Sequence, residues 1–583
     1  QNGRIVRYDR KTGERKSIMP QAEEGQPPLR WNWTAPILIS PHDPRTLYTA
    51  AQRVFKSTDR GQSWTSISPD LTYDLNRDEM QIMGVAGRDI TVARNDGVSS
   101  FGNITALAES PRRAGLLYGG SDDGNIQVSR DGGASWSSVA SRVPGVPKLI
   151  YVSRITPSAF AEGTVYASFD GHRSDDFKPW VFMSTDYGET WRSISSNLPT
   201  GSVYVIKEDP KNQNLLYVGT EFGLFVSADR GANWTRWKGM PTVAIYDLVI
   251  HPRDNDLILG THGRSIIVID DITPLQQLTP AVLSAANHVF EIGPAVQYIP
   301  NENGWFLGGR SFRAPNRALG AFINYHLRTA AKDDVTIAIS DASGNVVRRL
   351  TGPKTAGMHR VAWDLRAEPF GPATTGLAGA VVLTNLGPFV LPGDYRVQVT
   401  IDGKAETRTA KVLPDPLVEM TDADRQTLYK TLVTMTSVQR TADTAANAAI
   451  KLDEQMASIG TALKAYADVP PAAATAVGNL TKRVTELRTS IAGRPGQGGG
   501  GGGGGGGPQP LRNRINSLKQ EMIGSQSLPT RLQLAQVEAV QKQLATLVGQ
   551  INEVIVASMP ALYKQLSESN IHPGLGTVPP IKP

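Results

Sequence analysis

The sequence contains no cysteine, and this absence excludes disulfides, zinc–thiolate sites and cysteine nucleophiles together. No apolar run reaches the roughly eighteen residues that a membrane-spanning helix needs, so we predict no membrane span. The 60 Lys and Arg residues nearly balance the 54 Asp and Glu residues, and no block of five like charges occurs. A nucleic-acid partner is therefore not predicted.

Motifs for cofactors and metals are also missing. The eight His residues are scattered without a His-x-x-x-His spacing, and there is neither a phosphate-binding Gly loop nor a Gly-x-Ser-x-Gly elbow. Asp122–Asn125 is acidic enough for calcium, but one short loop rarely supplies six oxygen ligands. We expect no cofactor and no metal.

The length of 583 residues predicts about three or four domains. Gln1 begins without Met, and Gln1–Asp9 has the pattern of a turn and a strand. We therefore expect the chain to start inside a longer precursor.

An internal repeat dominates the first half of the chain. The octet Ser57–Trp64 returns as Ser129–Trp136, Ser184–Trp191 and Ser227–Trp234, and the last two copies are 43 residues apart. In each copy the short polar residue and Asp are expected to accept backbone N–H bonds in a tight turn, Gly supplies a positive φ, and Trp packs the hairpin. The structural positions are Ser57, Asp59, Gly61, Trp64, Ser129, Asp131, Gly133, Trp136, Ser184, Asp186, Gly188, Trp191, Ser227, Asp229, Gly231 and Trp234.

Alternating strands precede the octets, as in Leu117–Ser129 and Leu216–Ser227. A fifth copy, Leu259–Asp271, keeps the strands without the octet, and we expect it to be a closing blade.

These residues resemble the Asp-box (BNR) β-propellers, and within them bacterial secreted proteins similar to the VPS10/sortilin propeller that are often labelled glycosyl hydrolase-like. The resemblance covers roughly residues 1–275, and it implies that residues 1–280 form four to five propeller blades. Because such propellers are larger, it also implies that further blades precede Gln1.

The middle of the chain keeps the period of two without the octet. Residues 281–304 are interpreted as a linker and 305–414 as an Ig-like β-sandwich with Trp363 in its core, similar to FlgD-type modules.

The end of the chain changes to a period of three and four. Residues 415–572 are predicted to form an α-helical bundle that begins with a capping box at Thr421, is interrupted by a Gly-rich linker at 493–510, and is followed by a Pro-rich tail at 573–583. The bundle either stabilises and spaces the domains or self-associates through an uncovered apolar stripe.

Polar residues just ahead of the octet strands are the binding candidates. Repeat equivalence places them around one face of the ring, and they are Asp122, Asp123, Asp170, His172, Glu221, His262 and Arg264. No residue is assigned a catalytic role, since each octet Asp is committed to its turn.

Three functions remain open. We favour a secreted, periplasmic or cell-surface bacterial protein that binds a peptide, protein or glycan without catalysis. A sialidase- or xyloglucanase-like glycoside hydrolase would need two converging carboxylates, such as Asp122 and Glu221. A cell-surface structural protein, assembled through its helices and sandwich, is the third.

Overall fold

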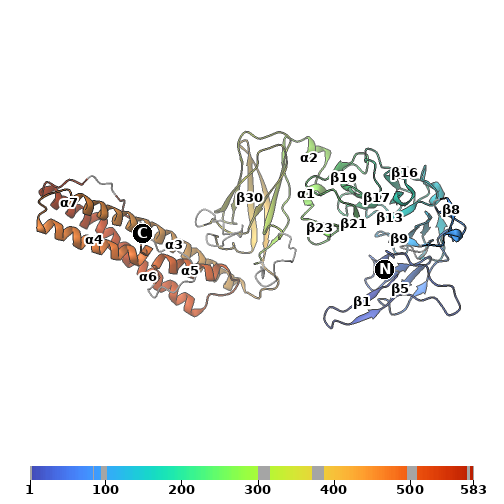
Figure 1. Ribbon diagram of the computed structural model, residues 1–583, viewed down its shortest axis with the longest axis horizontal. Coiled ribbons are helices and arrows are strands. Elements are labelled where there is room, and N and C mark those ends of the chain that lie inside the picture. Colours follow the sequence, from blue (N-terminus) through green and yellow to red (C-terminus); the bar gives the residue numbers. More distant parts are fainter. Residues whose placement is uncertain are drawn as a thin grey trace. The chain divides into compact units, whose positions relative to one another are not determined.

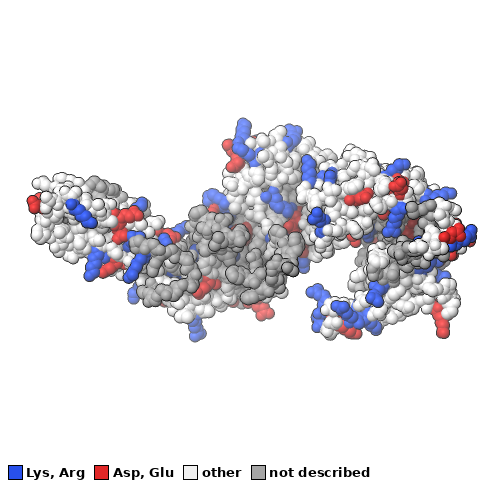
Figure 2. All heavy atoms as spheres, in the orientation of Figure 1, with Lys and Arg blue, Asp and Glu red and all other residues white. Residues whose placement is uncertain are grey.

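The computed structural model describes residues 3–82, 84–92, 101–299, 316–369, 386–494, 509–573 and 578–581. Its contacts divide the chain into two compact units, Gln1–Ser284 and Ala285–Pro583, which are described separately. Figure 1 labels the elements of both units. Figure 2 shows basic and acidic side chains interspersed on the visible face, in agreement with the balanced charge of the sequence.

The first unit consists of β-propeller blades, each an antiparallel sheet whose strands follow one another in sequence order. The first four blades have four strands each. They are β3 (Ile37–Ile39), β4 (Leu47–Ala50), β5 (Val54–Ser57) and β6 (Thr65–Ser66); β9 (Ile104–Glu109), β10 (Leu117–Ser121), β11 (Ile126–Ser129) and β12 (Ser137–Ser138); β13 (Tyr151–Pro157), β14 (Val165–Asp170), β15 (Trp180–Ser184) and β16 (Arg192–Ser193); and β17 (Val203–Glu208), β18 (Leu216–Thr220), β19 (Gly223–Ser227) and β20 (Thr235–Arg236).

The fifth blade has three strands, β21 (Ile245–Ile250), β22 (Leu257–Thr261) and β23 (Ile266–Ile269), as the fifth sequence copy predicts. Two hairpins, β1 (Val6–Tyr8) with β2 (Arg15–Ser17) and β7 (Gln81–Ile82) with β8 (Val85–Ala86), complete the strands described in this unit. The first strands of consecutive blades, β3, β9, β13, β17 and β21, contact one another, so they form the inner layer. Short helices α1 (Thr273–Gln276) and α2 (Pro280–Ser284) follow the fifth blade.

The predicted octet turns are present. In the first, Ser57 Oγ accepts the Gly61 N–H at 2.8 Å, Asp59 Oδ1 accepts the Ser63 N–H at 3.0 Å, and Gly61 has a φ of +82°. The other three turns repeat these bonds. Each octet Asp is therefore held by its own turn.

The octet Trp does more than pack its own hairpin. The indole N–H of Trp64 donates to the Ile18 carbonyl oxygen at 2.6 Å, that of Trp136 to Ile67 at 3.0 Å, and that of Trp234 to Ile194 at 2.8 Å. Each acceptor directly follows the last strand of the preceding sheet, so the indole joins successive sheets. Trp191 differs, because it donates to the Gly188 carbonyl of its own turn.

The second unit begins with two sheets that share one apolar core around Trp363. One sheet has the order β24-β26-β29 and the other β25-β31-β30-β27-β28. Their strands are β24 (Asn287–Val289), β25 (Ala295–Val296), β26 (Ala321–Leu327), β27 (Val335–Ser340), β28 (Val346–Gly352), β29 (Gly357–Trp363), β30 (Gly393–Ile401) and β31 (Lys404–Leu413).

The prediction of a linker at 281–304 is wrong for part of that segment. β24 pairs with β26, and β25 pairs in parallel with the end of β31. These strands are too short to show a period of two, so only their tertiary pairing defines them. Trp363 is fully buried and donates its indole N–H to the Arg366 carbonyl, which confirms its place in the core.

The C-terminal residues are helical. The helices are α3 (Asp422–Leu463), α4 (Pro471–Ala492), α5 (Leu511–Ile523), α6 (Arg531–Glu553) and α7 (Met559–Glu568), with a π-helical segment, Val554–Ser558, between the last two. The predicted capping box is present at Thr421, whose hydroxyl accepts the Asp424 N–H. The ten glycines 498–507 lie outside the described residues.

The predicted apolar stripes face one another in a single core. Leu432, Val484, Ile515 and Leu544, from four different helices, are each at most 4% exposed. These stripes are therefore covered within the chain, and they do not offer the uncovered surface that the self-association hypothesis invoked. The segment Arg531–Glu568 is long and apolar enough to cross a membrane, but core helices meet the same criterion, so we infer no membrane span from it.

Candidate functional site

All seven sequence-predicted site residues lie at one end of the blades, which we call the loop face. It is formed by the loops between the second and third strands, at 121–125, 171–179, 221–222 and 262–265, and by the beginnings of the inner strands. The arrangement repeats: the N–H groups of Asp122, Glu221 and His262 donate to the carbonyls of Asn103, Ser202 and Ala244, each just before or at the start of an inner strand. Equivalent loops therefore occupy equivalent places in these blades.

Asp122 and Asp123 are not available for a ligand. Asp122 accepts bonds from the backbone N–H groups of Gly102 and Asn103, and Asp123 accepts the N–H of Tyr73 and the hydroxyl of Ser121. Both aspartates are buried. Burial raises the pKa of Asp122, against the Asn103 bonds that lower it. The pairing of Asp122 with Glu221 as acid and base is therefore wrong, because the fold uses the Asp122 carboxylate to hold the loop.

A β-bulge occurs at the same place in the inner strands of the second to fifth blades. The bulged residues, left without a partner in the register, are Thr105, Ser153, Tyr204 and Tyr246. In the second and third blades the bulge hydroxyl ties neighbouring inner strands together: Thr105 donates to the Val152 carbonyl at 2.7 Å and Ser153 to the Val203 carbonyl at 2.8 Å. A small hydroxyl residue at this position therefore links its inner strand to the next one.

The fourth and fifth blades place tyrosines there instead. The rings of Tyr204 and Tyr246 stack with centroids 4.2 Å apart and an interplanar angle of 12°. The ring centroid of His262 lies 5.5 Å from that of Tyr246, and the angle between the two ring planes is 37°. Tyr204 is buried, whereas Tyr246 is 48% exposed, so the stack presents an aromatic surface to solvent. Sequence reasoning missed both tyrosines, although aligning Val203–Val205 with Ile245–Asp247 would have shown them.

Carboxylates surround this stack. Burial raises the pKa of Tyr204, and the nearby Tyr246, Asp170 and Glu221 raise it further. Two carboxylates from different blades thus influence one phenol. Glu221 Oε1 lies 3.4 Å from His172 Nδ1, while its buried Oε2 has no hydrogen-bond partner among the described residues. The rings of His172 and Phe177 are nearly perpendicular, with centroids 5.4 Å apart.

Comparisons with known proteins show no family to which this chain belongs. No family model and no curated protein matches the chain. Among solved structures, YCF48 bound to D1 peptide is 13% identical over 45% of this chain and 70% of its own, with a TM-score of 0.29. The GH74 xyloglucanase from Xanthomonas campestris is 16% identical over 66% and 58%, with a TM-score of 0.32. An extracellular domain of a hybrid two-component system from B. thetaiotaomicron is 12% identical over 71% and 48%, also at 0.32.

The match spans only about half of the last protein and less than two thirds of the xyloglucanase. Likenesses this distant do not transfer a function, because one fold serves many functions. The functional argument therefore depends on the loop face of this chain.

An ion pair lies beside the aromatic stack. Arg154 Nη2 is 2.8 Å from Asp247 Oδ1, so the pair joins the inner strands of the third and fifth blades. Lys207 belongs to the strand between them, and burial lowers its pKa, with Arg154 lowering it further. The sequence did not point to these residues, since the register of the inner strands brings them together.

The octet aspartates belong to the scaffold. Bonds from the side chain and N–H of Ser63 lower the pKa of Asp59 to about 2, and Ser135 does the same for Asp131. A carboxylate held in this way is a poor general acid or base near neutral pH. Within the described ranges, no group of three His, Asp or Glu residues could hold a metal ion.

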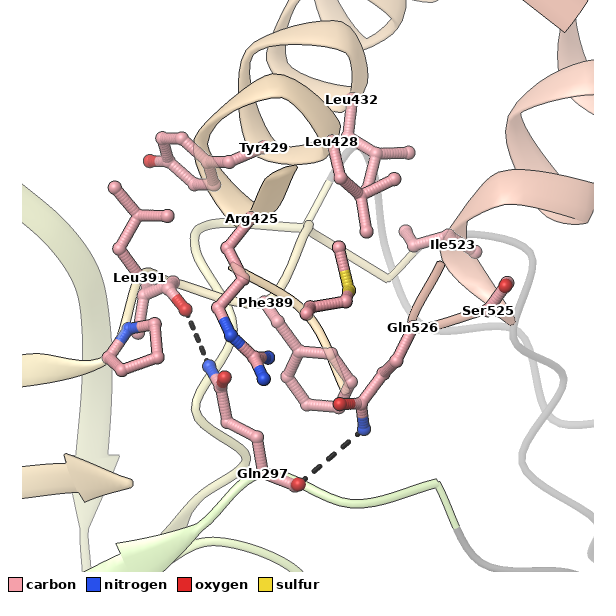
Figure 3. A pocket seen from close by; sticks show the side chains of 13 residues that line it. Gln297, Phe389, Leu391, Arg425, Leu428, Tyr429, Leu432, Ile523, Ser525 and Gln526 are labelled. Carbon is pink, nitrogen blue, oxygen red and sulfur yellow. Dashed lines mark hydrogen bonds between the residues drawn. The ribbon is translucent and has the colours of Figure 1, made fainter. Parts of the chain in front are cut away.

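A cavity in the second unit is a weaker candidate. It lies where the loop before β30 meets α3 and α5, with Arg425 and Gln526 among apolar side chains (Figure 3). Its volume is about 40 Å³, which has room for a few water molecules and no more. It is lined by Gln297, Phe389, Val390, Leu391, Pro392, Met420, Arg425, Leu428, Tyr429, Leu432, Ile523, Ser525 and Gln526.

Proposed function

We propose that this chain is a recognition or scaffold protein whose loop face binds a peptide, protein or glycan without catalysis. The observation that carries the proposal is the stack of Tyr204 and Tyr246 at the bulge position. Two other blades use that position for a hydroxyl that joins inner strands, at Thr105 and Ser153. The fourth and fifth blades give up that bond and present an aromatic surface instead.

The chemistry around the stack supports recognition. A half-exposed aromatic face stacks on sugar rings, peptide side chains or cations, and it loses little conformational entropy in doing so. Glu221 and Asp170 add acceptors, and His172 and His262 add groups that donate or accept. Together they form a surface with an apolar centre and a polar rim.

The proposal is tested by glycan and peptide arrays with the whole chain and its Tyr246→Ala variant. The matched control is Tyr8→Ala, because Tyr8 is 54% exposed on β1 of another sheet. We expect binding that Tyr246→Ala weakens about tenfold or more and Tyr8→Ala leaves unchanged. Binding that survives Tyr246→Ala, or no binding on either array, would contradict the proposal.

A glycoside hydrolase is the second candidate, and one observation favours it. Asp170 and Glu221, from different blades, both raise the pKa of Tyr204, and glycoside cleavage uses a pair of carboxylates. Product analysis of every bound glycan separates the candidates. Cleavage that Asp170→Asn and Glu221→Gln each abolish would establish the hydrolase, whereas unchanged glycans would leave recognition.

The remaining parts of the chain complete the proposal. We propose that the two-sheet module is Ig-like and similar to FlgD-type modules, and that the C-terminal helices form a bundle that stabilises or spaces the domains. We propose a secreted, periplasmic or cell-surface location in a bacterium, which the resemblance of the octets supports. Size measurement of the chain over a concentration series tests self-association, which the buried stripes disfavour.

A further inference from the structure

The fifth blade lacks the strand that completes the other four. After β23 the chain turns at Asp270 and enters α1 at Thr273, whereas the other blades continue through an octet turn into β6, β12, β16 or β20. Among the described residues, no strand pairs with the free edge of β23. This edge reads Ile-Ile-Val-Ile, without the Pro or charged side chains that blunt most exposed edges.

The register shows that the strand with the free edge carries an exposed apolar position. Pairing within the blades makes Ile266 the equivalent of four residues that are each at most 1% exposed, Val54, Ile126, Val181 and Leu224. Ile266 itself is 67% exposed, and Val268 on the same strand is 49% exposed. The side chain at this repeat position is therefore buried in the first four blades and exposed in the fifth, where it is Ile266.

In the four complete blades this position packs against the following blade, whose strands share its apolar cluster, and it is also bonded to the end of its own fourth strand. The residue after the fourth strand donates its N–H to the carbonyl of the equivalent residue: Ile67 to Val54, Val139 to Ile126, Ile194 to Val181 and Trp237 to Leu224, at 2.8 to 2.9 Å. The side chains of each pair also belong to one apolar cluster. In the fifth blade neither this donor nor this side chain is present among the described residues.

The sequences that fill the position define the chemistry of an occupant. They are Trp-Thr-Ser-Ile at 64–67, Trp-Ser-Ser-Val at 136–139, Trp-Arg-Ser-Ile at 191–194 and Trp-Thr-Arg-Trp at 234–237. We propose that the free edge of β23 binds an extended segment of a partner protein with the pattern Trp-x-x-(Ile/Val/Trp), added antiparallel as the fourth strand of the blade. A second copy of this chain fits less well, because all four of its matching segments are already paired in their own blades.

The test uses the whole chain and a fluorescent peptide that copies residues 229–239. A control peptide is N-methylated at the residue that copies Trp237, which removes the donor but keeps the side chain. We expect saturable binding of the first peptide below about 1 mM and binding at least about tenfold weaker for the second. Ile266→Asp should weaken binding of the first peptide by a similar factor, while Ile39→Asp, at a 60% exposed position of the first blade, should not.

Three outcomes would overturn the proposal. They are no saturable binding up to about 1 mM, equal binding of the N-methylated peptide, and equal loss in the Ile39→Asp variant. Light scattering without peptide gives a further check: a dimer that Ile266→Asp dissociates would assign the edge to a second copy instead. None of these measurements involves the loop face, so their failure leaves the recognition proposal standing.

Discussion

The phenol of Tyr166 donates a hydrogen bond to Glu208 Oε1 at 2.9 Å, and the two residues belong to consecutive blades. Tyr48 and Glu109 repeat the relationship two junctions earlier, at 3.2 Å. At the junction between them, Pro157 takes the place of the Glu, and the buried hydroxyl of Tyr118 has no hydrogen-bond partner in the described structure. One repeat position therefore shows the same tyrosine with and without its acceptor.

This difference predicts that the same substitution destabilises the fold at one position and has almost no effect at the other. Tyr166→Phe should lower the free energy of unfolding by about 1 to 2 kcal/mol, because it removes a donor from a buried carboxylate. Tyr118→Phe should change the free energy of unfolding by less than about 0.5 kcal/mol, because the buried Tyr118 hydroxyl makes no hydrogen bond that the substitution could remove. Denaturant unfolding of both variants measures this, and equal losses would refute the assignment.

The indole bonds between sheets give a second prediction. Trp234→Phe removes the bond to the Ile194 carbonyl of the preceding blade, whereas Trp191→Phe removes a bond within its own turn. Both indoles are more than nine-tenths buried, so the loss of ring volume is similar. We expect Trp234→Phe to cost about 1 kcal/mol more in unfolding free energy. An equal cost would mean that the inter-blade bond contributes nothing.

The octet aspartates predict a loss of stability in acid. The pKa of Asp131 is lowered to about 2 by bonds from Ser135, below the ordinary value of 3.8 that holds in the unfolded chain. The ionised carboxylate therefore stabilises the fold above about pH 4, and this contribution is lost as the pH falls toward 2. At pH 5, Asp131→Asn should melt at a lower temperature than wild type, and this difference in melting temperature should shrink as the pH falls to 2. A difference that stays constant over this range would contradict the prediction.

A buried lysine predicts a rise in stability at high pH. Lys519 in α5 is 1% exposed, and burial lowers its pKa to about 8, although Asp443 acts to raise it. The unfolded chain keeps this proton up to a pH of about 10.5, so stability should rise between pH 8 and 10.5 as the folded state sheds its buried charge.

Lys519→Met should stabilise the chain at pH 7 by about 1 to 3 kcal/mol and remove this rise. Lys564→Met, at an exposed site of α7, is the matched control and should do neither. Denaturant unfolding at pH 7, 8 and 10.5 provides the measurement. A rise that persists in Lys519→Met would show that another group titrates.

The sequence determined the repeat and everything local to it. A turn such as Ser57–Trp64 closes on bonds between residues two to four positions apart, so its residues predict its geometry without knowledge of the rest of the chain. The same holds for the helices, whose period of three and four marks the side that must be covered. Repeat equivalence also placed Asp170, Glu221 and His262 at one end of the blades, because equivalent loops follow equivalent strands.

Only the tertiary structure decided which polar residues remain free for a ligand. Asp122 and Glu221 occupy similar places in the sequence repeat. The Asp122 carboxylate accepts hydrogen bonds from backbone N–H groups about twenty residues earlier, whereas Glu221 is close enough to Tyr204 to raise its pKa. The stack of Tyr204 and Tyr246 joins two bulges 42 residues apart, and Ile266 is exposed because neither a fourth strand nor a following blade covers it among the described residues. Pairing of distant strands and burial of one side chain by another depend on the whole fold, so no local pattern records them.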